Sequence, residues 1–383
     1  MEYDLSNVNK NFILVFEYYT ATGLDDLCIS SEAAALISGL VDDLVNEDVY
    51  LLLSKKYSYL GEDKKNIHLI ILDEDKSENA LEDFLIDNVS KFSRSIFISS
   101  EEDNNLYDIT RFLEDNNVKL YVSDTESTRI CSDKFETFMA LQYKCDYLPL
   151  TYKVINDPKI YWKKPIEYNL KAINVPGESC DVGPIPDDLE IKTKLIAKPL
   201  NGVDCEKIKI ISNKSDIDEL DNLFPEGNGI LIQEFIEGEV LSVSLLSDGV
   251  KALPISLNKQ HVNLENDLGT YLGGELPYNH PAKDKIFDVA KKVVESIEGL
   301  KGFVGVDLIV KEEDGEYIPY VIEINSRFTT PYVGLRKVLN INIGQTILDL
   351  IDGKLSIDDI DNLSFKSGVK FIKKNGQLNI ETV

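Results

Sequence analysis

Three polar residues interrupt two apolar runs near the C-terminal end of the sequence: Asp307, Glu323 and Asn325. Each carries an oxygen that can bind a hard divalent cation such as Mg²⁺ or Mn²⁺, with phosphates and water completing the coordination shell. An unpaired carboxylate among Val, Ile and Leu is costly, so the pattern favours a cation site over the alternative, a half-exposed hairpin with an acidic edge. Arg327 adds a cation suited to a phosphate or a carboxylate.

A hairpin must position these residues. The pattern predicts strands over Phe303–Val310 and Tyr317–Asn325, joined by a turn at Asp314-Gly315. Side chains alternate between the faces of a strand, so Glu323 and Asn325 point the same way, and Asp307 joins them if it faces that side. Pro319 lacks the N–H donor of a sheet ladder and predicts an edge position or a bulge.

Two lysines earlier in the chain could reach phosphates. Lys198 ends a predicted strand in the segment LIAKP, beside a turn at Asn201-Gly202. Lys134 begins a helix predicted within residues 126–150, where Ser132 or Asp133 is the N-cap. Alone, each lysine is a weak signal, because a strand end or a helix start often carries one.

The segment Gln233-Glu234-Phe235-Ile236-Glu237-Gly238-Glu239 predicts a strand that ends in acids and a glycine before a second strand begins. Such a connection can expose backbone groups to an adenine edge and a carboxylate to ribose hydroxyls. The alternative is a bulged connection between two strands.

The first 125 residues alternate strands and helices, which predicts a parallel sheet with helices on both faces. Strands are expected at residues 12–16, 49–53, 68–72, 95–98 and 119–122, and helices at 32–45, 78–89 and 105–116. Ligands bind beyond the carboxyl ends of such strands, so the predicted loop over residues 17–23 is a candidate substrate site, with Glu17, Tyr18 and Thr20. A plain connecting loop is the alternative.

The remaining chain predicts a Pro-rich boundary over residues 150–190 and closing strands over residues 368–383. A flexible loop is expected over residues 271–277. Its Gly273 and Gly274, together with Lys259, are further candidates for substrate binding.

The composition limits the classes of molecule that the protein can bind. A net charge of −27 argues against nucleic acid and against an anionic membrane surface. The five scattered cysteines and the absence of an apolar signal segment or membrane span predict a cytoplasmic protein with reduced thiols. The sequence contains no HExxH, GxxxxGK[ST], HRD or DFG motif. Both a monomer and a homo-oligomer are compatible with these features.

Taken in order, the segments LIAKP, LIQEFIEGEVLSVSLL, GVDLIV and YVIEINSR resemble the ATP-grasp superfamily over roughly residues 126–350. The resemblance implies an α/β (α+β) ATP-grasp fold. It implies a Rossmann-like pre-ATP-grasp domain over residues 1–125, a small lid subdomain with its preceding linker over 126–235, and a C-terminal subdomain with the metal site over 236–383.

The resemblance also implies roles by position. Lys134 and Lys198 would contact ATP phosphates, Glu234 to Ile236 would border the adenine, Glu239 would hold the ribose, and Gln233 would also belong to the ATP site. The metal ligands would be Asp307, Glu323 and Asn325, and the catalytic residues would be Arg327 and Lys198, with Arg327 binding a substrate carboxylate or an acyl phosphate. Gly305 stands where some relatives have an arginine near the transferred phosphate.

The segments FILVFEYYTATG, SLNKQ and YLGGELPYNHP narrow the resemblance to archaeal ATP-grasp ligases of methanofuran synthesis. That resemblance implies an ATP-dependent carboxylate–amine ligase whose substrates are an amino acid and an amine, namely L-glutamate and tyramine. Three alternatives stay open: a related ligase with a different amine, an acid–thiol ligase, and a non-catalytic nucleotide sensor.

Overall fold

The computed structural model describes residues 11–383 except 25, 27–28, 63, 74–78, 156–193, 201–207, 214, 217–218, 225–228, 265–268 and 375–376. Several sequence features lie outside the described residues: the turn at Gly202, most of the Pro-rich segment, and Cys28, Cys180 and Cys205. Cys131 and Cys145 are buried free thiols.

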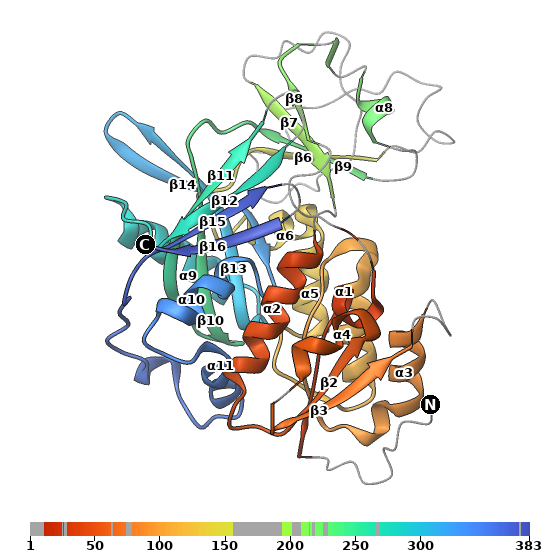
Figure 1. Cartoon of the computed structure of the whole chain (residues 1–383). Helices are drawn as coiled ribbons and strands as arrows, with labels where there is room; N and C mark the ends of the chain where they lie inside the picture. The colour runs from red at the N-terminus through yellow and green to blue at the C-terminus, as the bar shows by residue number, and fades with distance from the viewer. Residues whose placement is uncertain are drawn as a thin grey trace.

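The N-terminal region contains a five-stranded parallel sheet of order β3-β2-β1-β4-β5, at the lower right of Figure 1. Its strands are β1 (Ile13–Glu17), β2 (Val49–Ser54), β3 (Ile67–Leu72), β4 (Arg94–Ile98) and β5 (Lys119–Leu120). The intervening helices are α2 (Ser30–Asp43), α3 (Ala80–Asn88) and α4 (Asn105–Asp115). The apolar central strands β1, β2 and β4 are almost entirely buried, as in a sheet covered by helices, whereas the edge strand β3 is partly exposed. The predicted alternation of strands and helices is confirmed.

One prediction in this region is wrong. Residues 17–23 are not a loop, because Tyr18–Thr22 forms helix α1 directly after β1. The buried carboxylate of Glu17 is its N-cap and accepts hydrogen bonds from the backbone N–H groups of Tyr19 (3.0 Å) and Thr20 (2.8 Å). Gly23 ends the helix with φ 76°, the left-handed conformation that favours glycine.

Two short helices and a small sheet follow. Helices α5 (Thr125–Ser132) and α6 (Lys134–Leu141) meet at Asp133, which caps α6 through its carboxylate, as predicted. The sheet, in the upper part of Figure 1, is antiparallel with order β6-β9-β7-β8. Its strands are β6 (Thr151–Ile155), β7 (Leu195–Pro199), β8 (Lys209–Ile211) and β9 (Gly229–Glu234). Helix α8 (Leu220–Leu223) lies between β8 and β9 in the chain.

The C-terminal region is organised around a seven-stranded antiparallel sheet of order β14-β13-β10-β11-β12-β15-β16. Its strands are β10 (Glu239–Asp248), β11 (Ala252–Asn263), β12 (Thr270–Leu276), β13 (Lys301–Glu313), β14 (Glu316–Asn325), β15 (Val369–Lys374) and β16 (Gln377–Thr382). The predicted hairpin is β13–β14, and its turn has positive φ at both Asp314 (50°) and Gly315 (82°). Strand β14 lies at the edge of the sheet, which accommodates Pro319.

A second prediction, which concerns the seven-stranded sheet, is also wrong. Residues 271–277 are mostly strand β12 rather than a flexible loop. A Cβ at Gly273 would lie 2.0 Å from the carbonyl oxygen of Phe371, and one at Gly274 would lie 2.3 Å from that of Lys259. Both glycines therefore permit close approach of neighbouring strands.

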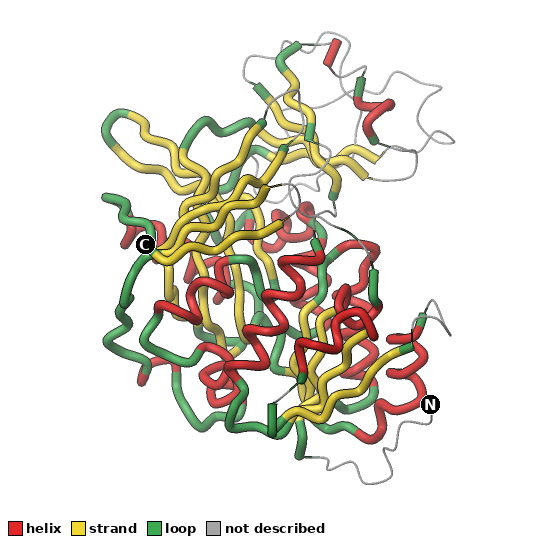
Figure 2. Tube along the Cα trace, in the orientation of Figure 1, coloured by secondary structure: helices red, strands yellow, loops and turns green. Residues whose placement is uncertain are grey.

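One face of the large sheet packs against helices, and the other carries polar side chains. Figure 2 shows helices lying against this sheet. Helix α9 (Lys283–Glu295) packs on one face against alternate apolar residues of β10 and β13, among them Val243 and Val306. The intervening positions, such as Ser244 and Asp307, face the other way. This alternation leaves a polar strip on the face that carries the site.

Helices α10 (Pro331–Val338) and α11 (Ile343–Ile351) join the C-terminal region to the N-terminal one by packing against α2. The buried carboxylate of Asp43, at the end of α2, accepts hydrogen bonds from the Tyr332 hydroxyl (2.7 Å), Arg336 Nε (3.0 Å) and the Gly344 N–H (3.2 Å). One polar cluster thus ties three helices together.

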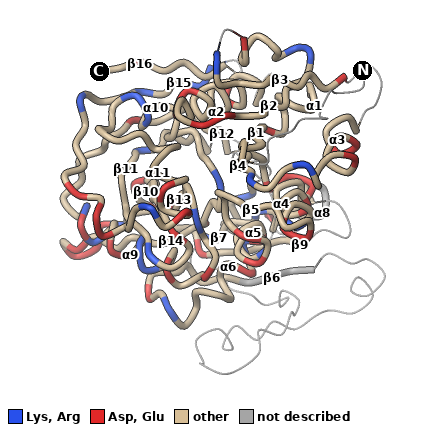
Figure 3. The backbone as a smooth tube through the Cα atoms, turned by 90° about the horizontal axis from the view of Figure 1, so that it is seen from below, with Lys and Arg blue, Asp and Glu red and all other residues tan. Residues whose placement is uncertain are grey.

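Charged positions are dispersed over the fold. Figure 3 shows acidic positions on α3, α4 and α5 with basic ones interspersed. In the described part of the chain, every helix is too short or too polar to cross a membrane.

Candidate active site

The hairpin brings its three polar residues to one face. Asp307 pairs directly with Glu323, and Gly305 pairs with Asn325. The register shifts at Ile322, so that Val321 packs toward α9 while Glu323 faces the opposite side. The Asn325 amide donates a hydrogen bond to Asp307 Oδ2 (2.8 Å), and Gln260 Nε2 on β11 donates to Oδ1 (2.8 Å). The expected convergence of the three side chains is confirmed.

The electrostatics of this group suit a cation. Burial, together with the charge of Glu323, raises the pKa of Asp307 to about 7. Burial also raises the pKa of Glu323, but the charges of Lys134 and Lys198 outweigh it, so that the pKa of Glu323 is lowered. Two facing carboxylates repel each other, and a divalent cation would relieve that repulsion. No group of three His, Cys, Asp or Glu side chains suited to a metal occurs among the described residues, so the donor set here is two carboxylates and one amide.

The two predicted phosphate lysines lie over the same carboxylates. Lys134, at the first position of α6, places Nζ 3.2 Å from Glu323 Oε2. Lys198, on β7, is buried, and its charge acts on Glu323. The Lys134 backbone N–H donates to the Leu200 carbonyl (3.1 Å), which fixes the start of α6 against the end of β7. Cations from two different elements therefore face the acidic end of the site.

The connection from β9 to β10 is anchored at both ends. The Gln233 amide donates to the Thr151 hydroxyl (2.8 Å), the Glu234 N–H to the Leu150 carbonyl, and the Phe235 N–H to the Lys194 carbonyl. Ile236 is buried at 5% exposure, and a Cβ at Gly238 would lie 2.4 Å from the Val310 carbonyl oxygen. The segment is therefore a fixed crossing between the small sheet and the large one.

Glu239 begins β10 and has two partners. The Tyr278 hydroxyl donates to its carboxylate (3.0 Å), and Lys259 Nζ lies 3.7 Å from Oε1. The Lys259 ammonium also lies over the Tyr278 ring, 4.7 Å from the centroid. Lys259 and Tyr278 thus belong to the Glu239 end of the site.

Arg327 connects the hairpin to the N-terminal sheet. Its Nε donates to Glu101 Oε2 at 2.7 Å, and Glu101 is 6% exposed. Glu101 follows β4, which lies beside β1 in the parallel sheet. In sheets of this kind, ligands bind beyond the carboxyl ends of strands where the strand order reverses. The ion pair therefore places Arg327 next to that crevice.

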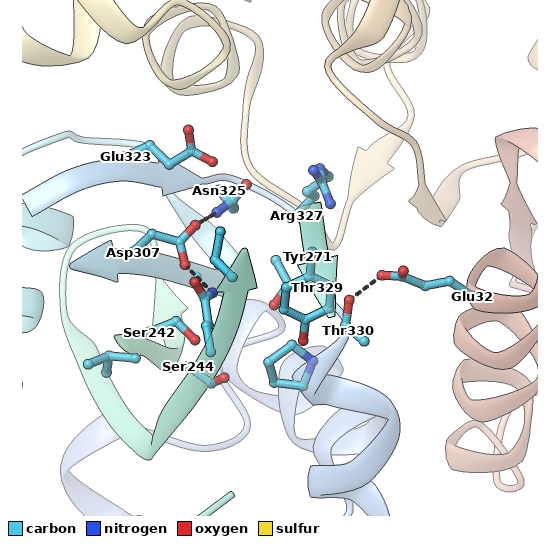
Figure 4. Close-up of a pocket in the computed structure, with 15 residues that line it drawn as sticks. Glu32, Ser242, Ser244, Tyr271, Asp307, Glu323, Asn325, Arg327, Thr329 and Thr330 are labelled. Atoms are coloured by element: carbon cyan, nitrogen blue, oxygen red, sulfur yellow. Dashed lines mark hydrogen bonds between the residues drawn. The ribbon is translucent and has the colours of Figure 1, made fainter. Parts of the chain in front are cut away.

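A cavity of about 120 Å³ opens between these parts (Figure 4). Its walls come from α2, the large sheet and the segment that begins α10. The residues that line it are Glu32, Ser242, Val243, Ser244, Gln260, Val262, Tyr271, Gly305, Asp307, Glu323, Asn325, Arg327, Thr329, Thr330 and Pro331. The metal candidates and Arg327 therefore share one polar cavity.

The residues proposed for substrate binding are divided by the structure. Arg327 lines the cavity, whereas Glu17, Tyr18, Thr20, Lys259, Gly273 and Gly274 are not among its lining residues. Glu17 and the two glycines have the structural roles described above. Tyr18 is half-buried on α1 and packs edge-on against Tyr19 at 5.7 Å.

Four residues of the site were not predicted from the sequence: Glu32, Glu101, Gln260 and Thr330. Glu32 reads as an ordinary helix-start acid, and Thr330 as part of a loop. For Glu101, the available signal was its position just after a parallel strand. That signal selects Glu101 only once β4 is known to lie beside β1, which the order of strands in the chain does not show.

The chain is similar in sequence to known proteins. A model of the ATP-grasp domain matches residues 131–331. The tyramine–L-glutamate ligase of Methanocaldococcus fervens is 32% identical over 326 residues, 85% of this chain and 89% of that protein. The corresponding enzyme of Methanocaldococcus jannaschii is also 32% identical, over 85% of this chain and 84% of its own.

Solved structures share the fold. A crystal structure from Archaeoglobus fulgidus assigned to the ATP-grasp superfamily gives a TM-score of 0.66 at 22% identity, covering 97% of this chain and 98% of that one. The L-amino acid ligase of Bacillus licheniformis gives 0.61 at 15% identity, covering 95% and 80%.

Proposed function

The chain belongs to the ATP-grasp family and is an ATP-dependent ligase that joins an acid to an amine; we propose that the acid is the γ-carboxylate of L-glutamate and the amine is tyramine. The observation that carries this proposal is the 32% identity with two tyramine–L-glutamate ligases over 85% of the chain. We further propose that the reaction is a step of methanofuran synthesis. The cytoplasmic location stays a prediction from composition.

We assign the ATP site to the crossing and the two lysines. Gln233, Glu234, Phe235 and Ile236 would border the adenine, and Glu239 would bind the ribose. Lys134 and Lys198 would bind the phosphates, because they face the carboxylates that would hold the metal. The domain limits proposed from the sequence, at residues 125 and 235, fall next to α5 and between β9 and β10.

Asp307, Glu323 and Asn325 would hold one or two Mg²⁺ or Mn²⁺ ions, since their side chains share one face of the hairpin and the two carboxylates repel each other. A metal bound there would neutralise charge on the ATP phosphates. Arg327 would bind the substrate carboxylate, or the phosphorylated product of the first step, with Glu101 fixing its guanidinium plane.

The proposed chemistry has two steps. A γ-carboxylate oxygen attacks the terminal phosphorus of ATP, the bond to the bridging oxygen breaks, and ADP leaves. The unprotonated amine then attacks the acyl carbon, phosphate leaves with the electrons of the C–O bond, and the nitrogen loses a proton. Lys134, Lys198 and Arg327 would offset negative charge when two anions approach each other.

The test is ADP release by purified protein with ATP, Mg²⁺, L-glutamate and tyramine, each omitted in turn. We expect release that depends on both substrates and a product with the mass of γ-glutamyltyramine. If a different amine or a thiol from a panel supports turnover and tyramine does not, that compound is the acceptor. ATP binding without turnover across the panel would contradict catalysis and favour a nucleotide sensor.

A further inference from the structure

The cavity has opposite chemical ends. Figure 4 shows Asp307, Glu323 and Asn325 on one side and Glu32 on the other, with Arg327 between them. The first side belongs to the hairpin and faces the phosphate lysines. The second side belongs to α2 of the N-terminal region, which takes no part in the proposed ATP site.

Glu32 is held in place by the C-terminal region. The Thr330 hydroxyl, just before α10, donates a hydrogen bond to Glu32 Oε1. Lys373 Nζ on β15 lies 3.8 Å from Oε2. The Glu32 side chain is 16% exposed and contributes to the cavity wall. A carboxylate oriented in this way is a preorganised partner for a cationic group of a ligand.

The cavity floor limits the shape of that ligand. Ser242, Ser244 and Gly305 line it, and the Asn258 amide fixes the two serine hydroxyls at 3.2 and 3.0 Å. A Cβ at Gly305 would lie 3.2 Å from Thr329 Cγ2, so the absence of a side chain there keeps the space open. A narrow, polar, unbranched molecule suits such a floor better than a phenol ring.

We infer that Glu32 binds the α-ammonium group of the amino-acid substrate and thereby selects the distal carboxylate for phosphorylation. The inference rests on the proposed function and extends it to regiochemistry. The two carboxylates of L-glutamate have similar reactivity and differ chiefly in their distance from the ammonium group. With the ammonium held at Glu32, the γ-carboxylate extends toward Asp307 and Glu323, while the α-carboxylate stays at the far end.

The experiment compares L-glutamate with glutarate, which has the same carboxylates but lacks the ammonium group. We expect the wild-type enzyme to prefer L-glutamate. In Glu32→Gln, KM for L-glutamate should rise at least about tenfold, with KM for ATP and for tyramine unchanged. The ratio of kcat/KM for L-glutamate over glutarate should fall by a similar factor, and the share of α-linked product should increase.

Two further variants keep the test decisive. Thr330→Val removes the hydroxyl that orients Glu32, so it should lower the same ratio by a smaller factor. Asp87→Asn removes one negative charge from exposed α3, outside the cavity, and should leave the ratio unchanged.

The possible outcomes are distinguishable. Absence of glutamate-dependent turnover in the wild type would overturn the proposed function and this inference together. An active Glu32→Gln enzyme with an unchanged ratio would overturn this inference alone. So would a rise confined to KM for tyramine, or equal losses on both acids accompanied by a lower Tm, which would mark Glu32 as a structural residue.

Discussion

Glu323 and Asp307 lie opposite each other on neighbouring strands, yet their pKa values move in opposite directions. The pKa of Asp307 rises to about 7 because of burial and the nearby Glu323 charge, whereas cations from α6 and β7 lower that of Glu323. The pair therefore depends on positive charge supplied from outside the hairpin. A metal and the lysines would supply it together.

Replacing Glu323 tests this dependence. Glu323→Ala should lower kcat at least ~100-fold, because it removes a proposed metal ligand and the partner of Lys134. The Tm should change by only a few degrees, since the side chain lies at the rim of the core. The measurement is ADP release alongside thermal unfolding. Glu316→Ala, at the exposed start of the same strand, is the matched control and should keep wild-type activity. Near-normal turnover of Glu323→Ala would refute the proposed role of the hairpin.

At the scale of elements, two segments proposed for substrate binding have structural roles. The first strand of the N-terminal sheet passes directly into a helix capped by Glu17, and the β12 glycines allow strands to approach closely. The polar residues after β1 and the paired glycines of β12 do have specific roles, but these roles satisfy requirements of the backbone. Polar residues after a strand and paired glycines occur in caps and sheets as well as in binding loops.

The Glu17 cap predicts a pH-dependent stability. Burial raises the pKa of Glu17 from 4.5 to about 7, against the opposing hydrogen bonds from Thr20 and Tyr19. Between these values the folded state holds the proton more tightly than the unfolded state. The contribution is therefore full below pH 4.5 and is lost as pH rises through 7, by at most about 3 kcal/mol.

Glu17→Gln should make that part of the stability profile less steep, leaving the share of Asp307, whose pKa is also raised to about 7. Gln can still accept one of the two N–H bonds, so a cost of about 1 kcal/mol near pH 5 is expected. Urea unfolding from pH 5 to pH 8 measures both effects. A slope in Glu17→Gln equal to that of the wild type would show that Glu17 does not contribute in this range.

Gly274→Ala tests the close approach of β12 and β11. A Cβ placed 2.3 Å from the Lys259 carbonyl oxygen must displace backbone, so we expect a loss of about 2 kcal/mol or more in unfolding free energy. Gly353→Ala has no atom within 4 Å of the new Cβ and carries only the strain of its positive φ, about 1 kcal/mol. The comparison uses urea unfolding midpoints. An undestabilised Gly274→Ala would return this glycine to the candidates for substrate binding.

At the scale of the whole molecule, α2 connects the parallel sheet to the C-terminal region. It carries Glu32 at its beginning, in the cavity wall, and Asp43 at its end, in the cluster with α10 and α11. The position of Glu32 in the cavity thus depends on packing near the opposite end of the same helix. Burial raises the pKa of Asp43, although Arg336 and Tyr332 oppose the shift.

Asp43→Ala should be strongly destabilising. It leaves Arg336, Tyr332 and the Gly344 N–H without their shared acceptor, at an expected cost of about 3 kcal/mol. The neighbouring Asp42 is 46% exposed, pairs with Lys64 and lies 3.5 Å from Arg336 Nη2. Asp42→Ala removes exposed ion pairs but no buried acceptor, so it should cost less than about 1 kcal/mol. Denaturant unfolding of the two variants gives the comparison. Equal losses would mean that the buried cluster does not hold the two regions together.

The strands that carry the site and the chemical types of its residues follow from local sequence patterns. Period-two patterns predicted β13 and β14 and the shared face of Glu323 and Asn325, because side-chain alternation is a local property of the backbone. Motif order likewise predicted the ATP-grasp fold. Local patterns of this kind require no knowledge of the partners of a strand.

The tertiary structure alone decided which of these residues meet. Lys134 contacts Glu323, Glu101 pairs with Arg327, and Glu32 lines the cavity from a helix that begins at residue 30, far from Asp307 in the chain. Sheet order and helix packing set such contacts, and both depend on burial of apolar surface over the whole chain. In the sequence, Glu32 is indistinguishable from any other helix-start acid; the fold places it opposite the proposed metal ligands.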